Sequence, residues 1–570
     1  MSRPIYPAQQ SMQSGQEALA TNDWEKAKEY FSAAVRIEET PECLEYLGLA
    51  SWWLDDAATT FSCREKAYRL YRELGDNKSA ARVAIALAFD YFSFQGEFVI
   101  ANGWSRRAHR LLEDLAPGVE HAMVKIFDGY VAVEVHHDPE KSFRLGTEIV
   151  ELARQLNEFD FLMMGLATEG LALVCQGHVK EGMQRLDETA TAALAGEIGD
   201  LDIAITVCCY LISACERVRD YGRAVQWCFH VNKAAGSGKY PLMFSQCQIH
   251  YSGILIWQGD WDEAEALLET YSEKLISSRP AHAAEGILLR ADLYRKRGKM
   301  AEATELIKQA GARPFRILGA NRLLLAKSAL AYDLGDFETA GMLSERYLRN
   351  TPESCRLALP PALELHVLIM IALGKILKAT ESAAALRKIA DTVGTEPLLA
   401  TAAYVEGTVA IAQGDYAFAY KSFELALELF EQNKNPFEAA RARTGLAQAM
   451  YLQGQKSNAL AEVHLALGIF ESLGAVIEKQ RARVVLNKIK SAQPRQLEKN
   501  LPETLTHREL EILREMAAGR DNAEIARKLF ISIRTAERHI SNIYGKIGAS
   551  GKAARAFTTA FAHRNHLLGE

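Results

Sequence analysis

The chain has 570 residues, of which 49% are apolar, 24% are charged and only 15 are proline. This composition is typical of folded soluble proteins and excludes a disordered or collagen-like chain. No apolar run approaches the roughly 18 residues that cross a bilayer, and the first ten residues contain no signal-peptide apolar stretch. We therefore expect a cytoplasmic protein with no membrane partner.

The nine cysteines contain no C-x-x-C pair, which argues against a zinc knuckle or a thioredoxin-like motif. Their odd number and their positions in apolar stretches indicate buried, reduced thiols in a reducing compartment. The charge is distributed unevenly. Residues 501–570 contain 11 Lys and Arg against 8 Asp and Glu, a balance of +3, whereas the other 500 residues carry −9. Only the C-terminal part therefore suits a polyanionic partner.

Residues 1–488 repeat a helical pair joined by a short turn. The clearest turns read Gly-Asp-aromatic, at 259–261, 335–337 and 414–416, and from Gly177 onward the turns recur every 37 to 42 residues. Poorer turns near Asp55-Asp56 and His137-Asp138 bring the total to about twelve units. Gly ends a helix in the left-handed conformation, Asp caps the next helix, and small residues allow close helix packing. No alternating strand pattern occurs, so we expect an all-α chain.

These units resemble the tetratricopeptide repeat, although the period of about 40 exceeds the usual 34. They are similar to the extended repeats in the sensor arm of the maltose-operon activator class. The resemblance implies an α-solenoid of about twelve helix pairs with a concave face. Such arrays bind peptides, proteins or their own neighbouring domains, and in some regulators a small inducer; the sequence leaves these partners open. The Trp residues are compatible with a ligand cage, but we favour helix packing for them.

Residues 489–501 lose the repeat pattern and are expected to be a linker. Residues 502–570 predict four short helices. Thr506 with Glu509, and Asp521 with Glu524, form capping boxes, with Asn522 as an alternative cap for the second helix. Ser532 is expected to cap the third helix and Ser550 the fourth.

The second and third helices have helix-turn-helix geometry. Positions 534, 537, 538, 541 and 545 lie on one polar face of the third helix, which fits a major groove, where Arg bridges guanine O6 and N7. Thr535 and Lys546 are placed to meet phosphate. The candidate DNA-contact residues are Arg534, Thr535, Glu537, Arg538, Ser541, Asn542, Lys546 and Asn522.

About 65 residues of this segment resemble the LuxR-type DNA-binding domain. The matching residues include Leu505-Thr506-x-Arg508-Glu509, Asn522-x-Glu524-Ile525-Ala526, Leu529-x-Ile531-Ser532, Lys546 and Gly548. The resemblance implies base contacts by Glu537, Arg538 and Ser541, a homodimer on duplex DNA, and RNA polymerase as a partner. The chain departs from the family at Glu537, where Lys or Arg is usual, and at Gly551-Lys552, where Ser-Arg is usual.

The sequence lacks the phosphate loop of the maltose activator's ATPase. Segment 236–239 reads Gly-Ser-Gly-Lys, but Lys233 stands where the first glycine is needed and Tyr240 where Ser or Thr is needed. No receiver domain or nucleophile–base pattern occurs, and the adjacent His136-His137-Asp138 reads as a repeat turn. We therefore expect no enzymatic activity, cofactor or metal. The hypothesis is a sequence-specific DNA-binding transcriptional regulator whose array senses a small molecule or protein. The alternative is an interaction scaffold whose tail has lost DNA binding.

Overall fold

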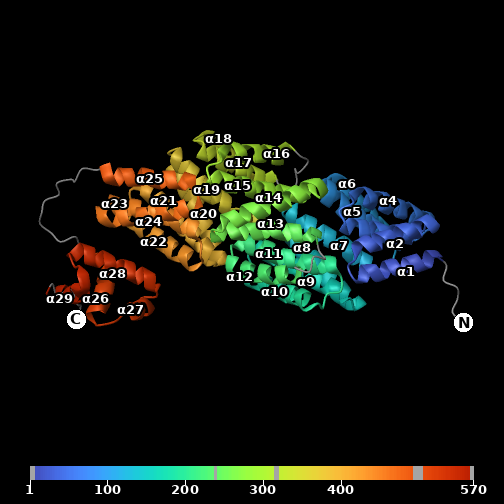
Figure 1. Ribbon diagram of the computed structural model, residues 1–570, viewed down its shortest axis with the longest axis horizontal. Coiled ribbons are helices and arrows are strands. Elements are labelled where there is room, and N and C mark those ends of the chain that lie inside the picture. Colours follow the sequence, from blue (N-terminus) through green and yellow to red (C-terminus); the bar gives the residue numbers. More distant parts are fainter. Residues whose placement is uncertain (1–6, 236–240, 313–319, 492–504, 565–570) are drawn as a thin grey trace.

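The structure is a computed structural model that describes residues 7–235, 241–312, 320–491 and 505–564. The described residues form helices and no strand. Figure 1 shows an elongated molecule in which a long helical array leads to a small C-terminal domain. The segment 236–240, which contains the incomplete phosphate-loop pattern, lies outside the described residues.

Twelve consecutive helix pairs and one further helix build the array, as the repeat count predicted. A π-helical turn (Tyr91–Gln95) follows α5, and a 3-10 turn (η2, Glu353–Ala358) precedes α19. The helices are α1 Pro7–Ala20, α2 Trp24–Ile37, α3 Pro41–Trp53, α4 Ala57–Glu73, α5 Asn77–Asp90, α6 Phe98–Leu112, α7 Val119–Glu134, α8 Pro139–Leu156, α9 Phe159–Gln176, α10 Val179–Ala195, α11 Leu201–Val218, α12 Tyr221–Ala235, α13 Pro241–Gln258, α14 Trp261–Ser278, α15 Pro280–Lys296, α16 Met300–Ala312, α17 Ala320–Asp333, α18 Phe337–Asn350, α19 Pro360–Ala372, α20 Ile376–Val393, α21 Glu396–Gln413, α22 Tyr416–Gln432, α23 Pro436–Leu452, α24 Lys456–Leu473 and α25 Val476–Ser491.

The turns between paired helices follow the predicted chemistry. Gly414 has φ 84°, and the next residue, Asp415, caps α22 by accepting a hydrogen bond from the Phe418 amide at 3.0 Å. The poorer turn at His137-Asp138 behaves in the same way: His137 has φ 55° and Asp138 caps α8. The histidine pair thus belongs to a repeat turn, as the sequence indicated. Gly at a left-handed position avoids the Cβ clash that other residues meet there.

The array is wound tightly enough for distant units to touch. The Arg279 guanidinium, between α14 and α15, bonds Asp55 at 3.1 Å and Ser93 at 2.9 Å. Further along, Arg481 on α25 bonds Asp333 of α17 at 2.7 Å. These contacts join residues more than 140 positions apart, so units that are distant in the sequence pack against one another.

Tryptophan side chains pack within this framework. The Trp24 and Trp53 rings stack at 4.6 Å, Trp257 stacks on Tyr221 at 4.1 Å, and Trp104 lies edge-on to Tyr68. These rings pack between helices, whereas Trp227 lines a hollow between α10 and α12. Helix α9 is long and apolar enough to cross a membrane by length and composition, but 67% of it is buried inside the array. We therefore assign α9 to the core.

The C-terminal domain has four helices around a small apolar core of Ile, Leu, Met and Ala side chains. The helices are α26 His507–Ala517, α27 Asn522–Lys528, α28 Ile533–Ile547 and α29 Ala554–Arg564. Both capping boxes form as predicted, at Thr506 with Glu509 and at Asp521 with Glu524. Ser550 makes no side-chain cap; a 3-10 turn, Gly551–Ala553, precedes α29 instead. The left-handed Gly551 (φ 72°) provides this tighter start. At the other side of the expected linker, α25 continues to Ser491.

Candidate nucleic-acid interface

Helix α28 is a strongly amphipathic helix fixed at both ends. At its start the Ser532 hydroxyl accepts a hydrogen bond from the Thr535 amide at 3.0 Å, and at its end Gly548 takes φ 72°. Ala536, Ile540 and Ile543 are buried in the domain core. Because these residues fix the rotation of the helix about its axis, the opposite face carries the polar residues.

The predicted contact residues divide by exposure. Arg534, Glu537 and Ser541 are exposed on the outer face of α28, while Arg538 is only 14% exposed. Thr535 and Asn542 are buried. The exposed set keeps one Arg and one Glu, so in this arrangement the face is less cationic than the sequence suggested.

Two further candidates are engaged inside the C-terminal domain. The Lys546 ammonium lies 2.7 Å from Glu509 Oε2, and both side chains are almost fully buried. The Asn522 carbonyl oxygen accepts a hydrogen bond from Arg555 at 2.9 Å. In the described arrangement both residues hold the domain together, so any phosphate contact by them requires these partners to be shared or exchanged.

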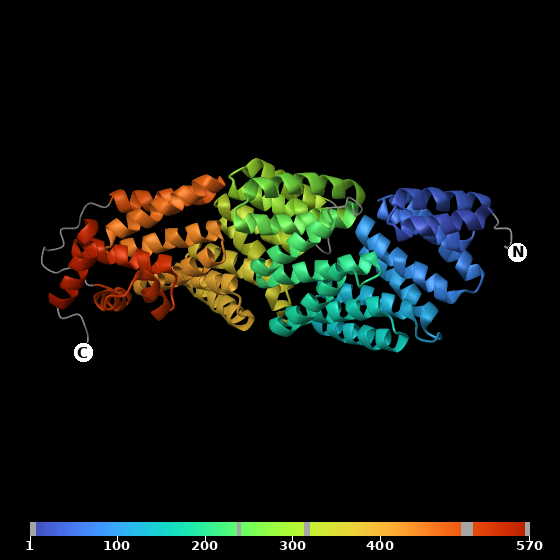
Figure 2. The ribbon, with the colours of Figure 1, turned by 60° about the horizontal axis from the view of Figure 1, so that its bottom comes forward.

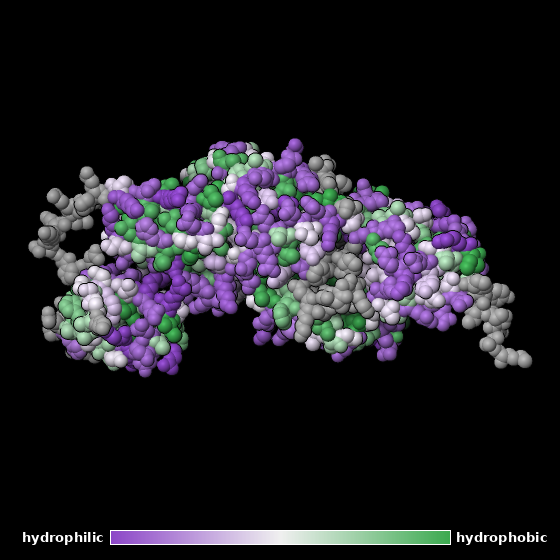
Figure 3. Space-filling view, viewed as in Figure 1, coloured by the Kyte–Doolittle hydropathy of each residue, from purple (hydrophilic) through white to green (hydrophobic). Residues whose placement is uncertain are grey.

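One part of α28, around Arg538, lies against the array. Arg538 Nη2 and His539 Nε2 each lie 2.8 Å from Glu424 Oε1, on α22. Figure 2 shows the C-terminal domain beside the last helices of the array, and Figure 3 shows hydrophilic residues along their boundary. The sequence analysis expected Arg538 to point outward, and it does so relative to its own domain, but α22 covers it.

Two more carboxylates on α22 extend this contact. Glu428 Oε1 accepts a hydrogen bond from the Ser532 amide at 3.1 Å, and Glu431 Oε2 lies 3.8 Å from Arg534 Nε. Glu424, Glu428 and Glu431 follow an i, i+4, i+7 spacing and so share one side of α22; we call them the acidic face. Glu428 thus lies at the N-terminus of α28, the kind of position at which helices bind phosphate.

Electrostatics at the contact favour the ionised pair. Burial raises the pKa of Glu424, but the hydrogen bond and charge of His539, with the charge of Arg538, outweigh it and bring the pKa down to about 2. Burial lowers the pKa of Arg538, but the charge of Glu424 more than compensates and the pKa is raised. For Glu428, burial dominates and raises the pKa. Glu424 is therefore the strongest anchor of the three.

The acidic face was not predicted from the sequence, although its three glutamates at helical spacing in one repeat are visible there. A row of charges on a helix is usually solvated, however, and nothing in the sequence says that residues over 100 positions away meet it.

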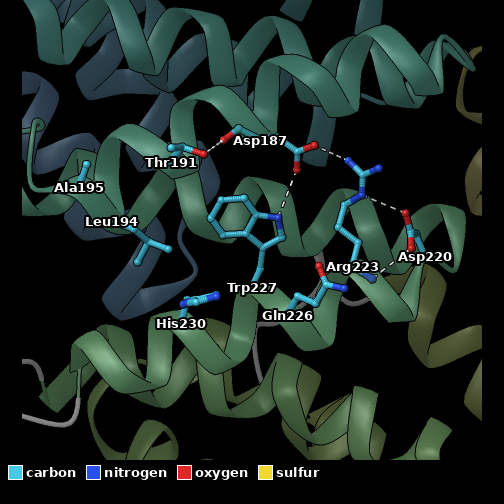
Figure 4. A pocket seen from close by; sticks show the side chains of 9 residues that line it. All are labelled: Asp187, Thr191, Leu194, Ala195, Asp220, Arg223, Gln226, Trp227 and His230. Atoms are coloured by element: carbon cyan, nitrogen blue, oxygen red, sulfur yellow. Dashed lines mark hydrogen bonds and ion pairs between the residues drawn. The ribbon is translucent and has the colours of Figure 1, made fainter.

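A hollow of about 780 Å³ lies between α10 and α12. Figure 4 shows that its polar side chains pair with one another: Arg223 bonds both Asp187 and Asp220, and the Trp227 indole nitrogen donates to Asp187 at 3.2 Å. The hollow is open, and its one guanidinium is already shared by two carboxylates.

Comparison with known proteins identifies the C-terminal domain. The family model "Bacterial regulatory proteins, luxR family" matches residues 503–557. The transcriptional regulatory protein LiaR of Bacillus subtilis is 38% identical over 114 residues, which are 20% of this chain and 51% of LiaR. YhcZ, an uncharacterized transcriptional regulatory protein of the same organism, is 41% identical over 66 residues, 12% of this chain and 29% of YhcZ. The chain thus spans about half of LiaR and less of YhcZ.

Solved structures resemble the array only distantly. The crystal structure of the APC/C hetero-tetramer Cut9-Hcn1 aligns with 87% of this chain and 95% of that chain, at 15% identity and a TM-score of 0.45. A tetratricopeptide repeat protein from Parabacteroides merdae aligns with 44% of this chain and 94% of its own, at 17% identity and a TM-score of 0.26. The architecture of the array is therefore described from its own helix pairs. Together with the family match, the capping boxes and the placement of α27 and α28 make the C-terminal part of this chain a helix-turn-helix domain of the LuxR family of bacterial regulatory proteins.

Proposed function

We propose that this protein is a cytoplasmic, sequence-specific regulator of transcription, without enzymatic activity, whose array holds the DNA-reading helix α28 in a closed state. The single observation that carries the proposal is the contact of Arg538 with Glu424 of the acidic face at 2.8 Å. A guanidinium bound to a carboxylate cannot bridge a guanine at the same time. Duplex DNA and the acidic face therefore compete for α28.

In this proposal the array senses a small molecule or a protein partner, and that event releases the C-terminal domain. A ligand shifts such an equilibrium only by its difference in affinity for the closed and open states. Once released, Arg534, Glu537, Arg538 and Ser541 reach base edges in the major groove. A homodimer on duplex DNA and contact with RNA polymerase belong to the same proposal.

Two substitutions with opposite expected effects test it. Glu424→Gln removes the carboxylate charge that holds Arg538 while keeping the side-chain shape, so we expect a rise of several-fold in affinity for duplex DNA. Arg538→Ala removes the base contact, so we expect a loss of about 1–3 kcal/mol in specific binding. Both are measured with the full chain at fixed salt, on a duplex enriched from a randomised library and on a scrambled duplex.

The matched control is Glu471→Gln, which removes one negative charge from α24 at a side chain 72% exposed and paired with Lys479. Equal gains from Glu424→Gln and Glu471→Gln would show a mere net-charge effect and overturn the closed state. Undiminished specific binding by Arg538→Ala would overturn the base contact. If Glu424→Gln binds no duplex at any salt, the scaffold alternative replaces the regulator; true phosphate binding weakens with salt, with a log–log slope of about −0.9 per contact.

A further inference from the structure

Three helices in the middle of the array bring metal-ligating side chains together. Glu216 on α11, His250 on α13 and Glu285 on α15 offer one ligand atom each, and these atoms lie within 4.8 Å of one another. His250 Nδ1 is 3.3 Å from Glu216 Oε2 and 3.9 Å from Glu285 Oε1. The side chains are 10%, 21% and 19% exposed for His250, Glu216 and Glu285, so the cluster is partly shielded from water.

The repeat architecture explains why the three residues meet. α11, α13 and α15 are the first helices of three consecutive pairs, and they lie side by side (Figure 1). Glu216 stands near the end of its helix, His250 near the middle and Glu285 near the start. The three positions therefore form a diagonal row across neighbouring helices, which no local sequence motif reveals.

We propose that Glu216, His250 and Glu285 form a binding site for a divalent transition-metal cation. One imidazole and two carboxylates suit Zn²⁺, Co²⁺ or Mn²⁺, whereas Mg²⁺ and Ca²⁺ prefer all-oxygen ligands. With metal–ligand bonds of about 2.0–2.2 Å, tetrahedral donors lie roughly 3.3–3.5 Å apart. The observed 3.3 Å between His250 and Glu216 matches this spacing. The Glu285 oxygen is 3.9 Å from His250, and the three ligand atoms lie within 4.8 Å of one another, so Glu285 must move closer to bind the same cation.

Neighbouring charges orient the ligands. An Arg322 guanidinium nitrogen bonds Glu285 Oε1, and the charge of Glu285 is the largest cause that raises the pKa of Arg322. Arg322 holds this carboxylate in place, as outer-shell partners of metal ligands do. The carboxylates of Glu216 and Glu285 supply the negative charge that favours a divalent cation.

The alternative occupant of the cluster is a proton, because a protonated His250 also sits well between two carboxylates. Cobalt distinguishes the two. The chelator-treated full chain is titrated with Co²⁺ alone and followed by visible absorption and by the thermal midpoint. We expect one equivalent, ligand-field bands without a thiolate-to-cobalt charge-transfer band, and a higher midpoint with Co²⁺, Zn²⁺ or Mn²⁺ but not with Mg²⁺.

Variants assign the site. His250→Gln and, separately, Glu216→Gln should weaken Co²⁺ binding at least tenfold and remove the gain in midpoint. The control is His366→Gln, which changes another buried histidine of the array, on α19, bonded to Ser344 at 2.9 Å. Circular dichroism confirms that each variant folds. Absence of binding, an unchanged affinity in both cluster variants, or a thiolate band would overturn the site. If the thermal midpoint depends on pH in the parent but not in His250→Gln, and does not change with added metal, the occupant of the cluster is a proton and not a metal. No step involves DNA, so the result is independent of the proposed regulatory function.

Discussion

At the scale of single residues, the sequence predicted the polar outer positions of α28 but not their contact with α22. Arg538 was recognisable because helical spacing and the LuxR-type resemblance place it among the outward positions. Glu424 was not, because its role depends on where the whole C-terminal domain lies on the array. Lys546 shows the same limit: it was expected to meet phosphate, and only the fold reveals its buried pairing with Glu509.

Glu424 should make the closed state sensitive to acid. Its pKa is about 2 in the closed state against an ordinary 4.5, so its contribution is fully present above pH 4.5 and is lost as the pH falls toward 2. The shift corresponds to a contribution on the order of 3 kcal/mol. Energy transfer between dyes on the array and the C-terminal domain should report opening as the pH is lowered from 6.

The Glu424→Gln variant should be open already at pH 6 and lose most of this dependence, whereas Glu471→Gln should follow the parent curve. Retention of the parent pH profile by Glu424→Gln would contradict the assignment. Circular dichroism across the same range separates opening from acid unfolding.

At the scale of helices and turns, the sequence was most informative. Turns with Gly at the end of one helix and Asp at the start of the next predicted the pairs. The glycine acts through its own backbone conformation and the aspartate side chain accepts from an amide three residues on, so neither needs a distant partner. The predicted cap at the start of α29 was wrong, because it was judged from the residue type of Ser550 alone. Ser550 is a good cap by type, but Gly551 turns the chain before the side chain can serve.

Close packing between neighbouring pairs predicts an unusual response to alanine. A Cβ on Gly445 in α23 would lie 2.4 Å from Cε1 of the buried Phe423 ring. Gly445→Ala should therefore cost about 1–3 kcal/mol, although alanine normally favours a helix. Hydrogen exchange of the α22 and α23 amides measures the loss.

The matched substitution is Gly468→Ala, in the neighbouring helix α24, where a new Cβ meets nothing within 4 Å. It should stabilise the helix by about 0.5–1 kcal/mol. If both substitutions stabilise, the ring of Phe423 moves aside more easily than the packing implies.

At the scale of the whole molecule, the tight winding of the array was beyond sequence reasoning. The number of pairs follows from counting turns, but the pitch depends on small rotations summed over many units. Arg279 demonstrates the result: besides Asp55 and Ser93, it lies 4.3 Å from the Trp52 ring centre and 4.5 Å from that of Phe94. The proposed metal cluster depends on the same geometry, which is why the sequence predicted no metal.

Arg279→Ala should loosen the array. The substitution removes the guanidinium that bonds Asp55 and Ser93 and leaves a cavity between the Trp52 and Phe94 rings. We expect a local loss of about 3–5 kcal/mol in the free energy of unfolding, typical of breaking a buried ion pair. Faster hydrogen exchange in α3 and α5, with a larger radius of gyration in solution scattering, would show it. Arg290→Ala is the control, since Arg290 bonds Tyr294 on its own helix and Glu269 on the helix before it. A similar response from this variant would mean that Arg279 is not a special link.

The acidic face and α28 belong to one polypeptide, and this sets the kind of competition that DNA meets. Closure is a unimolecular equilibrium, insensitive to dilution, whereas capture of a duplex is bimolecular and weakens as the protein becomes scarce. Under the proposed function, closure therefore weakens the apparent affinity for every duplex by the same factor, whatever the protein concentration. Low-affinity sites then need more protein to fill, and the contact acts as an affinity threshold.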